Sequence, residues 1–332
     1  MPVENIPVPT TLVLWSQRLL KGLALGLVAS LNTQAANLIV GDQSYSARTV
    51  MEAAGVLENL PYELEWKQFT AGSPVAEALN VGSLDIGLLG DSPALFMGAL
   101  GAPIKVIGVS RQNLDGVAIV VRKDSPIKTV ADLAGKKVAI WKGSFSQQLM
   151  LSALDKAGVA RDAVEYRYLS ALDSSHALDG GSVDAIATWE PYVTQQERQG
   201  ARIIATAEGL IPAQSFIVAN DQAIKDKRTQ ISDFLQRLQA ARAWSVSDPQ
   251  HNERYANAWA ALTKADADAE VARRWFSRAQ VVVVPITAQV VAGAQQTIDF
   301  FNNAGLTKRY PAASVFDESF SAALADQAQA AR

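Results

Sequence analysis

Residues 78–91 read ALNVGSLDIGLLGD, and residues 177–190 read ALDGGSVDAIATWE. Aligned without a gap, the two stretches share Ala, Leu, Gly, Ser and Asp at matching positions, and each ends in an acid, Asp91 or Glu190. Each has the pattern of a helix end, a Gly-Ser turn and an apolar strand. A strand that is apolar on both faces is typical of a parallel sheet covered by helices. The pattern predicts two copies of one α/β unit, unless common helix–turn–strand preferences alone produced the likeness.

The two acids come at the points where the predicted strands end. Residues just beyond the carboxyl ends of such strands line the ligand crevice of open α/β sheets. We therefore expect Asp91 and Glu190 to face one another from two similar lobes.

Short apolar strands alternate with helices from LIVG at residues 38–41 to SFIVA at residues 215–219, and a helical tail follows. This order predicts an α/β protein with two lobes, each a mostly parallel sheet flanked by helices, and a ligand cleft between them. We expect residues 37–120 and 217–332 to form lobe 1, which includes the C-terminal helices. Residues 121–216 are expected to form lobe 2.

The first 36 residues have the pattern of an export signal, because Arg18 and Lys21 precede an apolar stretch at residues 22–31 and the small-residue tail NTQAA. The apolar stretch is shorter than the roughly 18 to 20 residues that a membrane-spanning helix needs. We expect cleavage after Ala35 or Ala36 and a soluble protein in the periplasm.

The composition narrows the function. The 332 residues include no cysteine, which excludes thiol nucleophiles and thiolate metal ligands. The formal net charge of −3, without a long basic run, argues against nucleic acid as a partner.

Signals for catalysis are weak. His176 and His251 lie in separate predicted helices and belong to no metal-spaced cluster, and the motifs GxSxG, HExxH, Walker A and GxGxxG are absent. Asp91 and Glu190 resemble an acid–base pair only in residue type, since the sequence supplies no geometry for them. We expect a binding protein with no catalytic residue, metal or cofactor.

The loops after the strands suit an anion. Gly143 to Ser146 lies between a strand and a helix, where free backbone N–H groups and the positive end of the helix dipole favour negative charge. Ser92 with Pro93, and Ser44 to Ser46, predict two more helix starts at strand ends. Arg111, beside Gln112, could bind the anion in a bidentate contact or hold Asp91 in place.

Aromatic side chains fall at the same strand ends. Tyr45, Trp141, Phe145 and Trp189 could form the wall for an apolar ligand tail, or they could pack in the core. Trp244, Trp259, Trp275 and Phe276, in the helical tail, are expected in the core.

The segments EALNVGSLDIG, GDSPALF, VVRKDSPIKTVADLAGKKVAIWKGS and GSVDAIATWEPY resemble the periplasmic substrate-binding proteins of ABC importers for aliphatic sulfonates. Relatives of that family bind taurine, nitrate or bicarbonate. The similarity runs from about residue 37 to residue 220, and more loosely to the C-terminus. It implies the two-lobed class II periplasmic binding protein fold. We expect a monomer that captures an alkanesulfonate and delivers it to an ABC permease in the inner membrane for sulfur acquisition.

The resemblance also implies that the anion sits on serine and backbone groups at Ser92, Ser144, Phe145 and Ser146. Many relatives have Asn or Asp at the position of Glu190, and Trp141 departs from the usual pattern in a way that we expect to alter pocket size. The candidate ligand-binding residues are Gln43, Tyr45, Asp91, Ser92, Arg111, Gln112, Trp141, Gly143, Ser144, Phe145, Ser146, Trp189 and Glu190.

A sulfonate stays ionised, so the two acids would repel it if they touched it. We expect Asp91 and Glu190 to face the organic tail or a polar group on it, or to brace the loops from behind. Taurine, nitrate and bicarbonate remain alternative ligands, although the aromatic residues favour an organic tail. An enzyme similar to the thiamine pyrimidine synthase of the same fold, or a periplasmic sensor module, is the alternative from another class.

Overall fold

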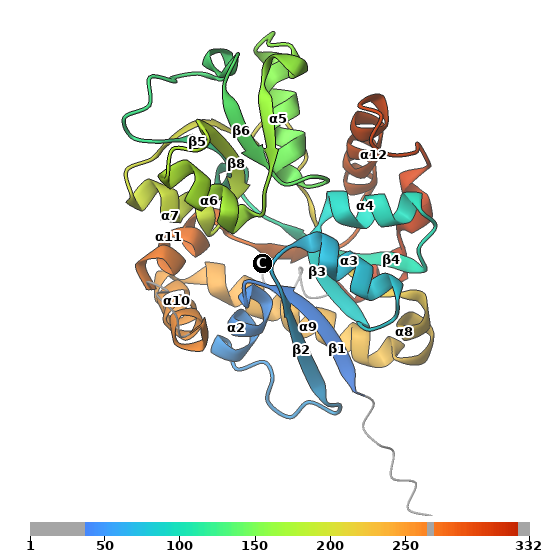
Figure 1. Ribbon diagram of the computed structural model, residues 1–332. Coiled ribbons are helices and arrows are strands. Elements are labelled where there is room, and N and C mark those ends of the chain that lie inside the picture. The colour runs from blue at the N-terminus through green and yellow to red at the C-terminus, as the bar shows by residue number, and fades with distance from the viewer. Residues whose placement is uncertain (1–36, 264–268, 325–332) are drawn as a thin grey trace, which may run out of the picture. The chain divides into compact units, whose positions relative to one another are not determined.

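Two β-sheets with flanking helices organise the computed structural model, which describes residues 37–263 and 269–324 (Figure 1). The predicted export signal at residues 1–36 lies outside the described residues. In the described part, the first sheet has six strands in the order β11-β4-β10-β3-β1-β2, and the second has five in the order β7-β6-β8-β5-β9. The α/β class and the two-lobed architecture predicted from the sequence are confirmed.

In each sheet most strands are parallel, and the strand that follows a crossing from the other sheet runs in the opposite direction. In the first sheet β1 (Leu38–Gln43), β2 (Leu64–Phe69), β3 (Ile86–Gly90) and β4 (Ile104–Arg111) run one way, while β10 (Ser215–Asn220) and β11 (Val282–Val284) run the other way. In the second sheet β6 (Lys137–Ile140), β7 (Glu165–Tyr168), β8 (Ala185–Trp189) and β9 (Arg202–Thr206) share a direction that β5 (Val117–Val121) opposes. β5 and β10 are reversed because each enters its new sheet from the edge at which the other strands end.

The crossing into the second sheet precedes β5. A boundary after residue 120 would leave most of this strand in the first lobe, whereas Val117–Val121 pairs along its length with β8 and β9. The sequence prediction missed this because β5 and β10 are equally apolar, and apolar pattern alone does not say which sheet a strand joins.

Helices cover both sheets. The helices near the first sheet are α2 (Ser46–Ala53), α3 (Gly72–Asn80) and α4 (Asp91–Ala99); those near the second are α5 (Phe145–Lys156), α6 (Ala171–Asp179) and α7 (Tyr192–Arg198). The C-terminal helices are α8 (Asp221–Asp226), α9 (Arg228–Ser247), α10 (Pro249–Thr263), α11 (Ala269–Ala279) and α12 (Ala288–Asn303).

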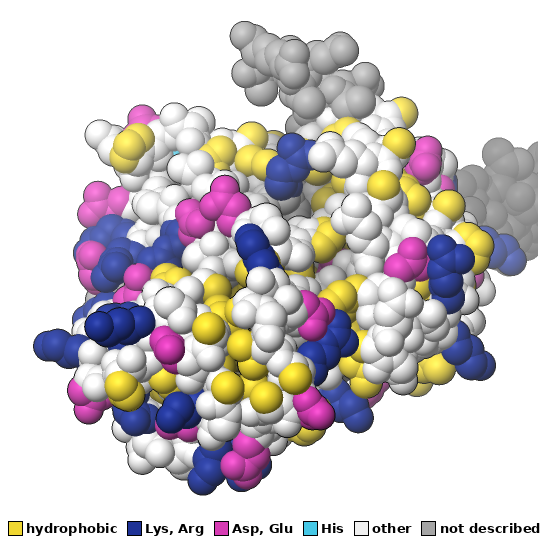
Figure 2. Space-filling model, turned by 90° about the horizontal axis from the view of Figure 1, so that it is seen from above, with side chains coloured by type: hydrophobic (Ala, Val, Ile, Leu, Met, Phe, Trp, Pro, Cys, Tyr) yellow, Lys and Arg dark blue, Asp and Glu magenta, His cyan; other side chains and the backbone are white. Residues whose placement is uncertain are grey.

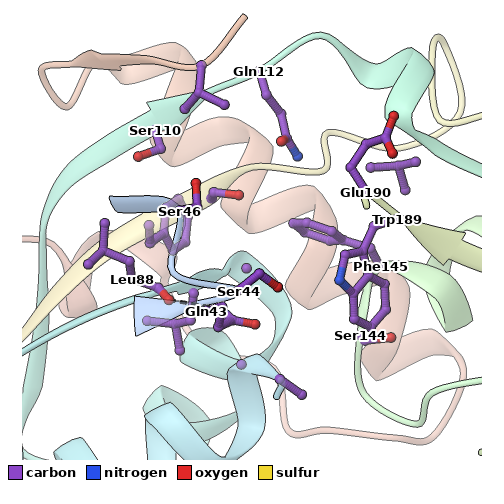
Figure 3. A pocket seen from close by; sticks show the side chains of 18 of the residues that line it. Gln43, Ser44, Ser46, Leu88, Ser110, Gln112, Ser144, Phe145, Trp189 and Glu190 are labelled. Carbon is purple, nitrogen blue, oxygen red and sulfur yellow. Dashed lines mark hydrogen bonds between the residues drawn. The ribbon is translucent and has the colours of Figure 1, made fainter. Parts of the chain in front are cut away.

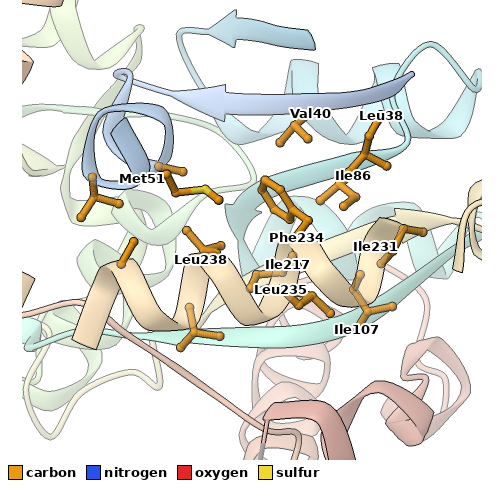
Figure 4. Close-up of a cluster of buried hydrophobic side chains, with 14 of the residues drawn as sticks. Leu38, Val40, Met51, Ile86, Ile107, Ile217, Ile231, Phe234, Leu235 and Leu238 are labelled. Atoms are coloured by element: carbon orange, nitrogen blue, oxygen red, sulfur yellow. The ribbon is translucent and has the colours of Figure 1, made fainter. Parts of the chain in front are cut away.

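The C-terminal helices return to the first sheet, as expected. Phe234, Leu235 and Leu238 of α9 pack in one buried cluster with Val40 of β1 and Ile217 of β10 (Figure 4). On the other face of the sheet, α12 joins a second cluster with α3 and α4. Burying each such side chain contributes about 1.5–3 kcal/mol, so the tail is part of this lobe's core.

The repeated sequence is a repeated structure. Gly82 and Gly181 both have φ +72°, the left-handed conformation that favours glycine at a helix end. The following serines, Ser83 and Ser182, donate their hydroxyls to the carbonyls of Ala78 and Ala177, at 3.0 and 3.1 Å.

The aspartates of the repeat, Asp85 and Asp184, also have equivalent roles. Each accepts the backbone N–H of the neighbouring strand, from Ile39 at 2.7 Å and from Lys137 at 2.8 Å. The five shared residues therefore end a helix and fix a strand beside its neighbour in both sheets.

Acidic and basic side chains are interspersed on the face of the protein shown in Figure 2. Within the described residues, no helix is both long and apolar enough to span a membrane.

Candidate functional site

A cavity of about 170 Å³ lies where strands of both sheets end (Figure 3). Gln43, Leu88 and Ser110 line it from β1, β3 and β4, and Trp189 lines it from β8. The loop after β6 and the start of α5 complete the second side. The expected cleft between the lobes is therefore present at the carboxyl ends of the strands. Of the candidate residues, the cavity is lined by Gln43, Gln112, Trp141, Ser144, Phe145, Trp189 and Glu190.

The first-lobe side is held by local hydrogen bonds. Gln43 donates its side-chain amide to the Leu88 carbonyl at 2.8 Å, which ties the ends of β1 and β3 together (Figure 3). Asp42 accepts the backbone N–H groups of Gln43, Ala47 and Arg48, at 2.8 to 3.1 Å, and so fixes the start of α2. Burial raises the pKa of Asp42 above its ordinary value, and these N–H groups offset part of that effect.

The second-lobe loop satisfies most of its own polar groups. Ser146 accepts the Trp141 N–H at 2.7 Å, and Ser144 donates to the Trp141 carbonyl at 2.8 Å. The Gly143 N–H donates to the Gln147 side chain at 2.7 Å. Ser144 lines the cavity, but Gly143 and the fully buried Ser146 do not. Because these groups already have partners, the loop is shaped before any ligand arrives.

Aromatic rings form much of the second-lobe wall. Trp141, Phe145 and Trp189 line the cavity, and the Phe145 ring lies so close to Gly90 of the first sheet that an added Cβ would be 3.0 Å from it. Trp275 of α11, expected only in the core, belongs to the core and also lines the cavity. Tyr45 instead packs against the first-lobe core and is not among the lining residues.

The two acids of the repeat do not face one another. Asp91 is fully buried outside the cavity and accepts hydrogen bonds from Ser92 at 3.1 Å, Thr297 at 3.3 Å and the Gln214 N–H at 3.4 Å. Burial raises the pKa of Asp91 to about 6, against the effect of these hydrogen bonds. Ser92 is buried with it and does not line the cavity.

Glu190 does line the cavity, but its carboxylate is engaged from behind. It accepts the Thr194 N–H at 3.0 Å and the Thr194 hydroxyl at 2.9 Å, and it lies 3.2 Å from the Arg278 guanidinium. Burial raises the pKa of Glu190, while the positive charge of Arg278 opposes that rise. Both acids therefore brace loops, which was one of the roles expected for them.

Arg111 is exposed and lines a separate hollow beside α12, while its neighbour Gln112 lines the cavity. The hydrogen bonds of Asp91 do not include Arg111.

Sequence reasoning missed several lining residues, most importantly the buried Arg242 of α9, together with Asp42, Ser110 and Gly116. Arg242 follows Phe234 and Leu238 at intervals of four residues, so it continues the buried face of the helix. An arginine on the apolar face of a predicted helix was the sequence signal that could have indicated a buried functional residue.

Nothing in the described ranges favours a metal, since no group of three or more His, Cys, Asp or Glu side chains is placed to hold one. His251 stacks on Trp244, with ring centroids 4.4 Å apart, and its Nδ1 lies 2.9 Å from the Trp244 carbonyl oxygen.

Comparison with known proteins places the chain in a family. The model of the NMT1/THI5-like family matches residues 63–252. The chain belongs to this family. A relative in Escherichia coli (strain K12), named for the binding of aliphatic sulfonates, is 35% identical over 240 residues, which are 72% of this chain and 74% of the relative.

Two solved structures extend the similarity to nearly the whole fold. The periplasmic aliphatic sulphonate binding protein SsuA of Escherichia coli is 31% identical, with a TM-score of 0.76 over 85% of this chain and 92% of its own. The alkanesulfonate-binding protein SsuA of Xanthomonas axonopodis pv. citri, bound to MOPS, is 29% identical, with a TM-score of 0.78 over 86% of this chain and 99% of its own.

Proposed function

We propose that this protein is the periplasmic binding component of an ABC importer and that it captures aliphatic sulfonates between its two lobes. This proposal rests on the cavity at the strand ends, which has polar side chains on one side and Trp141, Phe145 and Trp189 on the other. Such a site combines a few polar anchors with an apolar wall. The similarity to proteins named for sulfonate binding supports the same ligand class.

The aromatic wall separates sulfonates from bare inorganic anions. Nitrate or bicarbonate has no apolar part to place against three rings, whereas an alkyl chain gains about 25 cal/mol for each Å² of apolar surface buried there. Taurine has only a short chain, ending in an ammonium. We therefore rank alkanesulfonates above taurine, and taurine above nitrate and bicarbonate.

Delivery to a membrane permease completes the proposal. Export of the chain by its first 36 residues would place it in the periplasm, where it would act as a monomer and need no cofactor. Binding without turnover fits the cavity. Of the two acids that line it, Glu190 is engaged by Thr194 and Arg278, and Asp42 accepts backbone N–H groups at the start of α2.

A thermal-shift panel tests this function. Butanesulfonate, taurine, sulfonate buffers, nitrate and sulfate are added separately to the purified protein. A ligand that binds only the folded state raises the Tm according to its concentration relative to Kd. We expect the largest rise with butanesulfonate, and a response to nitrate or sulfate alone would refute the proposal.

A further inference from the structure

Arg242 is a buried cation at the cavity. Its side chain is 5% exposed, on the face of α9 that packs against the first sheet, and it is among the residues that line the cavity. The two terminal nitrogens of its guanidinium donate to hydroxyls, one to Ser46 at 2.9 Å and the other to Tyr255 at 3.0 Å. Both partners are neutral. The Nε of Arg242 is buried and has no acceptor among the described residues.

No carboxylate in the described part of the chain forms an ion pair with Arg242. Asp42 is the acid that interacts with its charge. The positive charge of Arg242 lowers the pKa of the Asp42 carboxyl, although burial raises that pKa by more. The oxygens of Asp42, however, are committed to the N–H groups of Gln43, Ala47 and Arg48. Arg242 and Asp42 are therefore neighbours without being a pair.

Burying a guanidinium without a paired carboxylate costs up to several kcal/mol, and the neighbouring charge of Asp42 offsets part of this cost. The hydroxyls of Ser46 and Tyr255 fix its orientation, because Tyr255 also donates to the Ser46 carbonyl at 2.8 Å and its ring stacks on Phe276 at 3.5 Å. The cation is thus held rigidly at the edge of a cavity with an unused donor. A ligand anion that pairs with Arg242 would offset the free-energy cost of burying this charge.

We propose that Arg242 is the charge partner of the ligand's anionic head group, which lies on the first-lobe side of the cavity beside Ser46 and Gln43. This inference rests on the proposed function and reverses the expected polarity of the site. In the serine loop at the start of α5, the hydroxyls of Ser144 and Ser146 already form hydrogen bonds with the backbone of Trp141. The head therefore lies toward α9, and the tail extends toward Trp141, Phe145 and Trp189.

A pair of ligands that differ in charge isolates this role. Butanesulfonate and butanesulfonamide have the same chain, but the sulfonamide head is neutral at pH 7. Calorimetry gives Kd for both with the wild type, with Arg242→Gln and with Arg242→Lys. Arg237→Gln is the matched control, because Arg237 lies on the same helix, pairs with Asp233 at 2.7 Å and does not line the cavity.

We expect Arg242→Gln to weaken butanesulfonate binding about 100-fold, as is typical when one partner of a buried charge pair is removed. Butanesulfonamide should change less than about threefold, and Arg242→Lys should retain part of the preference for the anion. If Arg242→Gln keeps the wild-type ratio between the two ligands, Arg242 is not the charge partner, although the proposed function stands. If the wild type binds neither ligand, the proposed function itself fails.

A crystal structure of the wild-type protein with butanesulfonate gives an answer that does not depend on whether the variants fold. We expect a sulfonate oxygen within hydrogen-bonding distance of the Arg242 guanidinium. A head group lying instead on the α5 loop would overturn the assignment.

Discussion

The guanidinium of Arg278 lies 3.2 Å from the carboxylate of Glu190, and this contact joins the two lobes. Arg278 belongs to α11, which packs with the first-lobe core through Ala272, Trp275 and Phe276, while Glu190 follows the last residue of β8 in the second sheet. The contact is an ion pair without the alignment of a hydrogen bond. Arg278 also pairs with Glu197 of α7. One side chain of the first lobe thus holds two acids of the second.

Replacing Arg278 should favour separation of the lobes. Arg278→Gln leaves the buried Glu190 without its cation, so the form with the lobes together loses stability relative to an open form. We expect the calorimetric Kd for butanesulfonate to rise about tenfold, equivalent to about 1.4 kcal/mol. Arg273→Gln, on the exposed side of the same helix, is the control and should bind as the wild type does. Equal affinity in the two variants would show that the Arg278 contacts do not stabilise the ligand-bound form.

Gly90 allows the lobes to meet. An added Cβ at Gly90 would lie 3.0 Å from the Phe145 ring, which comes from the other side of the cavity. We expect Gly90→Ala to weaken ligand binding about tenfold while leaving the Tm of the ligand-free protein within about 2 °C of wild type. The double variant Gly90→Ala, Phe145→Leu should recover part of the lost affinity, because the smaller side chain restores the space. Failure of the second change to improve binding would point to a local effect on β3 instead.

Asp91 should make stability fall as the pH rises from 4 to 7. Its folded-state pKa of about 6 lies above the ordinary aspartate pKa of 3.8, so the folded protein holds this proton more tightly than the unfolded chain does. The contribution is fully present below pH 3.8 and is lost as the pH passes through about 6, with a size on the order of 3 kcal/mol.

Urea unfolding of the wild type and Asp91→Asn at pH 4 and pH 7 measures this contribution. From pH 4 to pH 7, the unfolding free energy of the wild type should fall relative to that of Asp91→Asn, because only the wild type loses the contribution of this carboxyl group. Parallel stability curves would mean that Asp91 titrates normally.

Trp189 should sense the ligand tail. Its ring lines the cavity and meets Tyr192 edge to face, with centroids 6.5 Å apart. We expect Trp189→Ala to lower the affinity for hexanesulfonate about tenfold and that for methanesulfonate less than about twofold, because only the longer chain buries apolar surface against the ring. Tyr168→Ala, which changes a ring that is 57% exposed, is the control. An equal loss for both ligands would place the ring against the head group.

Local sequence signals were enough for the repeated unit. Gly82 and Gly181, the serines after them, and Asp85 and Asp184 each act within a few residues or on the adjacent strand, so their spacing alone carried the prediction. The alternation of strands and helices predicted the two lobes, and the resemblance of longer segments then implied the class II periplasmic binding protein fold.

The site was predicted less completely because its chemistry depends on tertiary neighbours. Asp91 and Glu190 occupy matching positions, yet only Glu190 lines the cavity, since Asp91 turns toward Gln214 and Thr297. Ser146 was expected to bind the anion, but its hydroxyl accepts the Trp141 N–H. Arg242 reaches the cavity from a helix far along the chain, so the sequence pattern around the strand ends could not predict that it lines the cavity.

A calorimetric titration of the purified protein with butanesulfonate, with nitrate and sulfate titrated under the same conditions, tests the proposed function most directly. We expect one butanesulfonate bound per chain, with a Kd at least about 100-fold lower than that of either inorganic anion, because only the sulfonate presents both a charge to Arg242 and a tail to the aromatic wall. Tighter binding of nitrate or sulfate than of butanesulfonate would contradict it.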